Sequence, residues 1–117
     1  MFNKENIIIP EHVVIIPNGN RTWSKRKGLK SWEGYWHGYK NLSKTYEAFL
    51  NMEIPHLTIW GFSTENWKRD PKEVKEIFNI VEKIITKMEN ILVKENIRFQ
   101  HFGRKDRLPN NLITRIK

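Results

Sequence analysis

Short runs of β-branched and aromatic residues alternate along this chain with longer stretches of helical periodicity. The short runs cover residues 12–16, 56–62 and 97–102, and they predict three strands. Helices are predicted for residues 33–50, 71–94 and 112–116, the second of them with Asp70 as its N-cap and Pro71 at its first position. The strand–helix alternation predicts an α/β fold, a parallel sheet with flanking helices joined by right-handed crossovers.

The length and composition are those of one domain. A chain of 117 residues supports one hydrophobic core, and it contains no repeat, low-complexity tract or linker. We therefore expect a single domain over residues 1–117, with residues 1–10 as an N-terminal arm. The chain has no cysteine, which excludes disulfides and thiolate sites. The apolar run at residues 7–9 is far shorter than a membrane span of about 20 residues, so a cytoplasmic location is expected.

The net charge of +8 favours an anionic partner, namely nucleic acid, an anionic membrane surface or a molecule that carries phosphates. Charge alone does not choose among these. Single-strand nucleic-acid binders line a basic groove with aromatic side chains, and the chain has five tryptophans. Because those tryptophans fall largely on predicted strands and helix faces, a nucleic-acid-binding module is the most distant alternative.

The loops after the predicted strands carry most of the chemistry-bearing side chains. Ligands bind at the carboxyl ends of parallel strands, so loops 17–23, 63–69 and 103–107 are expected to line one site. They offer amides, hydroxyls and cations, which are Asn18, Gly19, Asn20 and Arg21; Ser63, Asn66, Lys68 and Arg69; Arg104 and Arg107. Turn amides beside arginines suit phosphate oxygens. An ordinary turn with solvated cations would explain any one loop, whereas three loops at one edge favour a phosphate or diphosphate site.

Two segments, HVVIIPNGNRTW and LTIWGFSTENWKR, resemble the cis-prenyltransferase family, the undecaprenyl diphosphate synthases and their relatives. The second segment matches the signature Phe-Ser-x-Glu-Asn-Trp-x-Arg, and FGRKDRLP over residues 102–109 resembles the segment that follows in such enzymes. The similarity runs from His12 to the last residue and implies the N-terminal half of the family fold, with the C-terminal half absent. Family members are magnesium-dependent transferases that add isopentenyl diphosphate in cis configuration to an allylic diphosphate and so make polyprenyl diphosphates.

The resemblance also implies roles for single residues. The catalytic positions are Asn18, Ser63 and Asn66, of which Ser63 and Asn66 would orient the reacting diphosphate or the proton that is lost. The substrate-binding positions are Gly19, Asn20, Arg21, Trp23, Phe62, Trp67 and Arg69. Arg69 would hold isopentenyl diphosphate. Helix-capping polar residues, packing tryptophans and an exposed cation are the alternatives that the local sequence leaves open.

The first motif departs from the family's Asp-Gly-Asn-x-Arg-Trp. Asn18 stands where the family has the aspartate that binds magnesium, and a neutral amide is a poorer ligand for a hard dication than a carboxylate. Thr22 stands where the family usually has an arginine that contacts the diphosphate of the allylic substrate. Family members are also about twice as long, still within the size of one domain.

These departures leave two alternatives. The chain is either a homologue that binds allylic and isopentenyl diphosphates, as a homodimer or in a heteromer, or a non-catalytic or split subunit completed by a complementary prenyltransferase chain. Handling of a long lipid product implies peripheral membrane contact, to which no segment is assigned.

Overall fold

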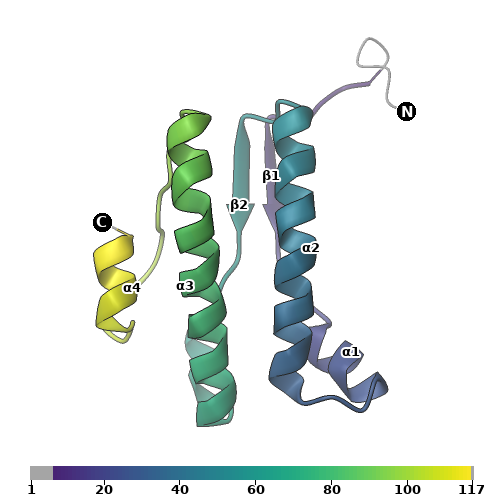
Figure 1. Cartoon of the computed structure of the whole chain (residues 1–117), viewed down its shortest axis with the longest axis vertical. Coiled ribbons are helices and arrows are strands. Elements are labelled where there is room, and N and C mark those ends of the chain that lie inside the picture. Colours follow the sequence, from purple (N-terminus) through teal and green to yellow (C-terminus); the bar gives the residue numbers. More distant parts are fainter. Residues whose placement is uncertain (1–6, 117) are drawn as a thin grey trace. The chain divides into compact units, whose positions relative to one another are not determined.

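A computed structural model describes residues 7–116 of the chain. They form two compact units, one that extends to Trp67 and one that begins at Lys68 (Figure 1). Most of the expected N-terminal arm, residues 1–6, lies outside the described residues, and residues 7–10 form neither helix nor strand. The single domain expected over residues 1–117 stays a prediction.

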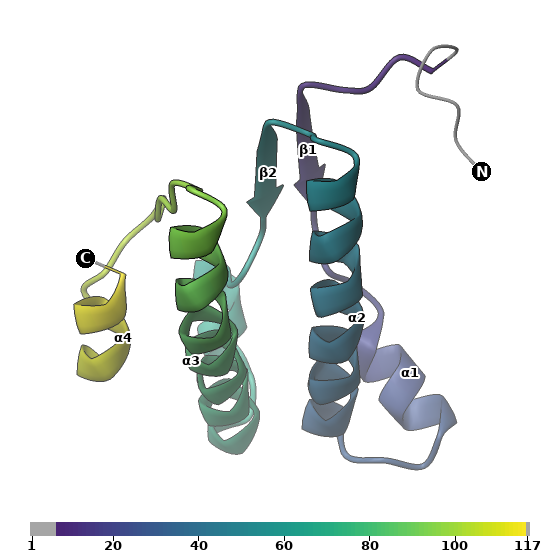
Figure 2. The same ribbon diagram turned by 45° about the horizontal axis from the view of Figure 1, so that its top comes forward.

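The first unit is built on a pair of parallel strands. Strand β1 is His12–Ile15 and strand β2 is His56–Ile59, with His12 opposite His56 and Ile15 opposite Ile59. Helix α2, Ser31–Asn51, connects the strands and runs alongside both of them (Figures 1 and 2). A 3-10 helix, η2, follows at Thr64–Lys68. The predicted α/β fold with a parallel sheet is therefore confirmed.

Helix α1, Asn20–Arg26, was not expected, because residues 17–23 carry the composition of a turn. It packs closely on the first half of α2. A Cβ atom on Gly34 would collide with the backbone of Asn20 and the hydroxyl of Ser24, and one on Gly38 would lie 2.7 Å from Asn20 Oδ1. The side chain of Ser24 is fully buried there. The two glycines, which lower the helix propensity of α2, thus allow α1 to approach it.

The second unit consists of helix α3, Pro71–Lys94, and helix α4, Asn110–Arg115. The N–H of Lys72 donates to Asp70 Oδ1 at 2.8 Å, so Asp70 caps α3 as predicted. The buried apolar residues are Val74, Ile77, Phe78, Ile80 and Ile85 of α3 and Leu112 of α4. Arg115 forms ion pairs with Glu82 and Glu89, which hold α4 against α3. No helix among residues 7–116 is long and apolar enough to cross a bilayer.

The strand predicted for residues 97–102 is wrong, because that segment has no strand structure. Within the described residues the sheet has two strands, β1 and β2. Alternation of apolar and polar residues favours an extended chain, but a strand also needs a neighbour to accept and donate its backbone hydrogen bonds. The other two strands end at Ile15 and Ile59, earlier than the apolar runs that predicted them.

The packing of α1 on α2 predicts that Gly34→Ala destabilises the protein, although alanine is the better helix former. The new methyl group would force α1 away from α2, which costs about 1–3 kcal/mol, as overpacking does elsewhere. Urea denaturation measures the free energy of unfolding. Gly61→Ala is the matched control, since a Cβ there meets open space. A Gly34→Ala protein as stable as the parent would contradict the packing described here.

Candidate functional site

The first two predicted site loops leave the same edge of the sheet. Strands β1 and β2 are parallel and in register up to Ile15 and Ile59, and the N–H of Trp60 donates to the carbonyl of Ile15 at 2.9 Å. Residues 17–23 and 63–67 therefore both follow the carboxyl ends of adjacent strands, where ligands bind in parallel sheets. The third predicted loop, residues 103–107, belongs to the second unit.

The turn between β1 and α1 depends on Asn18 and Gly19. The backbone N–H of Gly19 donates to Asn18 Oδ1 at 2.7 Å. Gly19 has a φ of 88°, in the left-handed region that glycine adopts without strain. Its carbonyl then accepts from the N–H of Trp23 at 2.9 Å, which starts α1. The amide oxygen of Asn18 is thus engaged in closing this turn.

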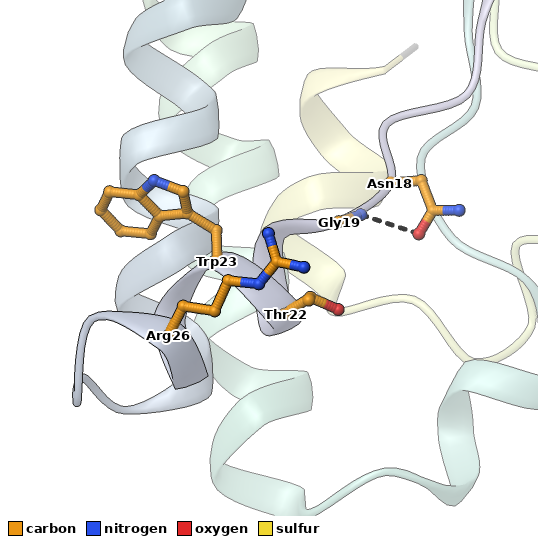
Figure 3. A pocket seen from close by; sticks show the side chains of 5 residues that line it. All are labelled: Asn18, Gly19, Thr22, Trp23 and Arg26. Atoms are coloured by element: carbon orange, nitrogen blue, oxygen red, sulfur yellow. Dashed lines mark hydrogen bonds between the residues drawn. The ribbon is translucent and has the colours of Figure 1, made fainter.

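An open hollow of about 590 Å³ lies at this turn, lined by Asn18, Gly19, Thr22, Trp23 and Arg26 (Figure 3). Thr22, Trp23 and Arg26 share one face of α1, because residues three and four positions apart are neighbours on a helix. The hollow thereby combines a guanidinium, a hydroxyl and an indole ring. A cation and a hydroxyl bind phosphate oxygens, and an aromatic ring offers an apolar surface beside them.

Trp23 is held in place by a ring on the neighbouring helix. Its indole lies 4.6 Å from the imidazole of His37, centroid to centroid, with the planes inclined at 48°. Trp23 is 38% exposed, so one part of the ring contacts His37 while another faces the hollow. Sequence reasoning missed both Arg26 and His37 as site residues. The spacing from Thr22 to Arg26 would have indicated Arg26 had residues 20–26 been recognised as a helix.

Two other residues of the first motif lie elsewhere on α1. The side chain of Asn20 reaches Gly38 of α2, where it packs between the helices and does not line the hollow. Arg21 lines a second, smaller hollow of about 440 Å³ with Thr22, Lys25, Leu29 and Ser31. The structure therefore separates the predicted substrate-binding residues of this motif onto different faces of one helix.

The residues of the second motif are joined to one another. The N–H of Ser63 donates to Asn66 Oδ1 at 2.9 Å, and the N–H of Asn66 donates to the carbonyl of Ser63 at 3.0 Å. The rings of Phe62 and Trp67 pack edge to face, with their centroids 5.2 Å apart. The amide oxygen of Asn66 thus stabilises the turn, while its NH₂ group can donate to a ligand.

Two predicted cations of the second unit, Arg69 and Arg104, have carboxylate partners. Arg69 forms an ion pair of 3.9 Å with Glu73, whose side chain is buried at the start of α3, where the helix dipole favours negative charge. Arg104 donates two hydrogen bonds to Asp106, at 2.7 and 3.0 Å. This contact lowers the pKa of Asp106 and raises that of Arg104. A ligand at either arginine would have to compete with that carboxylate.

The residues around the hollow do not fit a magnesium ion. Hard dications prefer carboxylate oxygens, and residues 12–32 contain neither Asp nor Glu. The one amide oxygen at the family's metal-binding position, Asn18 Oδ1, already accepts from Gly19. Among residues 7–116, no group of three or more His, Cys, Asp or Glu side chains is arranged to hold a metal.

The chain matches one protein family in sequence. The sequence model of the Prenyltransf family, described as undecaprenyl diphosphate synthase, matches residues 16–117. An isoprenyl transferase of Aquifex aeolicus is 37% identical over 105 residues, which are 90% of this chain and 46% of that protein. The trans,polycis-polyprenyl diphosphate synthase ((2Z,6E)-farnesyl diphosphate specific) of Thermobifida fusca is 35% identical over 109 residues, 93% of this chain and 39% of that one.

The fold has a counterpart among solved structures. Lavandulyl diphosphate synthase from Lavandula x intermedia, in complex with dimethylallyl diphosphate, superposes with a TM-score of 0.84 at 31% sequence identity, over 92% of this chain and 46% of that one. The chain thus spans less than half the length of each of these relatives. The predicted correspondence to one half of the family fold is confirmed by this coverage.

Proposed function

This chain belongs to the undecaprenyl diphosphate synthase family of prenyltransferases, and on that basis we propose that its hollow at residues 18–26 binds the diphosphate of an allylic isoprenoid diphosphate. The observation that carries the proposal is the grouping of Arg26, Thr22 and Trp23 on one face of α1, directly after the carboxyl end of β1. The dimethylallyl diphosphate complex of lavandulyl diphosphate synthase supports this class of ligand.

In this proposal Arg26 and the hydroxyl of Thr22 donate hydrogen bonds to diphosphate oxygens. Trp23, oriented by His37, provides an apolar surface for the isoprenoid chain. Arg26 takes the function that the resemblance assigns to an arginine at position 22, because one helical turn brings positions 22 and 26 to the same face. Gly19 leaves room for the ligand at the turn, since nothing lies within 4 Å of a Cβ built there.

The family's condensation breaks the bond between the allylic carbon and the diphosphate oxygen. The allylic carbon then bonds to isopentenyl diphosphate, and a proton is lost from the new chain. Negative charge develops on the departing diphosphate, so hydrogen-bond donors fixed in advance, such as Arg26, would stabilise it. Ser63 and Asn66 are the candidates for orienting the second diphosphate or the proton, and Arg69 the candidate for isopentenyl diphosphate if it exchanges Glu73 for the ligand.

Magnesium is the cofactor expected for the family, and it would assist departure of the diphosphate by neutralising its charge. The donor set around Asn18 does not fit that ion, so the proposed binding of the allylic diphosphate depends on protein cations. Together with this function we propose that the protein is cytoplasmic and forms a dimer, as the family resemblance implies.

A second candidate is that the chain is a non-catalytic or split subunit of a heteromeric prenyltransferase. One observation favours it: within residues 7–116 each strand of the β1–β2 pair has one neighbour, which leaves an edge for pairing. Condensation only after addition of a chain with the rest of the family domain would favour this candidate over a self-sufficient enzyme.

We expect Arg26→Gln to weaken binding of dimethylallyl diphosphate about tenfold or more, because a charge-assisted hydrogen bond to phosphate is worth roughly 1.5–3 kcal/mol. Isothermal titration calorimetry gives the dissociation constant. Arg98→Gln, the same change at an exposed site in the second unit, is the matched control and should bind as the parent does. Equal affinities for the parent and Arg26→Gln would overturn the assignment of the hollow.

Asn18→Asp tests whether the residue at position 18 decides if magnesium contributes to binding of the allylic diphosphate. A carboxylate can still accept from Gly19 and also supplies the oxygen that magnesium prefers. We expect added magnesium to change the affinity of the parent for dimethylallyl diphosphate less than about twofold. In the variant, magnesium should raise this affinity severalfold, because the ion would add a charge-assisted contact to the diphosphate. Asn41→Asp, at an exposed position of α2, is the control. Strong magnesium dependence in the parent would show that other residues hold the ion.

A further inference from the structure

Helix α1 and the turn that joins it to α2 concentrate positive charge. Residues 21–32, called the basic patch below, contain five cations, Arg21, Lys25, Arg26, Lys27 and Lys30. All five side chains are exposed. No acidic residue occurs from position 12 to position 32, so the patch has one sign of charge along its whole length.

Three cations of the patch, Lys25, Arg26 and Lys27, form no ion pair with the carboxylates of residues 7–116. The arginines that pair with carboxylates include Arg69, Arg104 and Arg115, all of which lie outside the patch. Glu33 is the next acidic residue along the chain, and its Oε2 accepts from the backbone N–H of Lys30 at 2.6 Å. The lysines of the patch are therefore available to an external anion.

Apolar side chains lie among these cations. Leu29 is 39% exposed and lines the second hollow together with Arg21 and Lys25. The ammonium of Lys30 lies 5.2 Å from the ring centroid of Trp32, which is half-buried. Tryptophan and leucine flanked by lysines are typical of surfaces that enter the head-group region of a bilayer. A polyanion such as RNA would gain from the cations but little from Leu29.

We propose that the basic patch docks on an anionic lipid bilayer, with Leu29 and Trp32 entering the interface and the lysines contacting lipid phosphates. This proposal rests on the proposed function in one respect. The isoprenoid chain of the proposed ligand partitions into bilayers, which favours a lipid surface over another polyanion. Helix α1 carries part of the patch and lines the hollow, and Arg26 belongs to both. Docking would therefore hold the proposed diphosphate site at the surface into which isoprenoid chains partition.

Sedimentation of the full chain with vesicles tests this docking. We expect binding to vesicles of phosphatidylglycerol and phosphatidylcholine, none to phosphatidylcholine alone, and loss of binding at high salt. Lys25→Gln, Lys27→Gln and Lys30→Gln combined should weaken binding about a hundredfold, since one lysine near an anionic bilayer contributes roughly fivefold. The matched control combines Lys40→Gln, Lys44→Gln and Lys75→Gln, which are exposed outside the patch. It removes the same charge and should change binding little.

Leu29→Ser distinguishes binding to a bilayer from binding to other polyanions. It should weaken vesicle binding about fivefold by removing apolar area from the interface and leave binding to a single-stranded oligonucleotide unchanged. The docking proposal is overturned by the absence of vesicle binding, by equal losses in the two triple variants, or by a Leu29→Ser protein that binds vesicles like the parent. Vesicle binding without binding of dimethylallyl diphosphate in solution would support the docking while it overturns the proposed function.

Discussion

The close contact between α1 and α2 is the constraint on which the candidate site depends. Gly34 and Gly38 present no side chain to α1, so the backbone of Asn20 and the hydroxyl of Ser24 can lie against α2. The buried hydroxyl of Ser24 also donates to the carbonyl of Ser31 at 3.3 Å, across the turn between the helices. This contact fixes the orientation of α1. It thereby decides which side chains line the hollow, which pack against α2 and which face solvent.

The three faces of α1 have different chemistry, and the proposals follow from that division. One face holds Thr22, Trp23 and Arg26 around an open hollow, which suits a diphosphate with an apolar tail. A second packs on α2, and a third presents Arg21 and Lys25 to solvent. Asn18 stands where the resemblance implies a magnesium-binding carboxylate, and its oxygen closes the turn with Gly19. The proposed allylic diphosphate site therefore depends on a protein cation, Arg26, for its positive charge.

The sequence predicted the elements whose signals are local and missed those that depend on distant partners. Helix α3 was predictable because its cap and its apolar spacing lie within the same stretch, and the parallel pairing of β1 and β2 followed from the intervening helix. Residues 97–102 alternate like a strand but do not form one, because pairing depends on another segment. Helix α1 was missed because Asn18 and Gly19 favour a turn and its packing partner, Gly34, is distant in sequence. Arg26 was missed with it.

The most direct test of the proposed diphosphate site is a titration of the ¹⁵N-labelled chain with dimethylallyl diphosphate, in which the amide chemical shifts are measured. Ligand bound in the hollow should shift the amides of Gly19, Thr22 and Arg26 most, with smaller changes at His37 through its contact with Trp23. We expect this pattern without added magnesium. Saturable binding whose largest shifts fall outside residues 18–26, for example at Arg104 and Arg107, would contradict it.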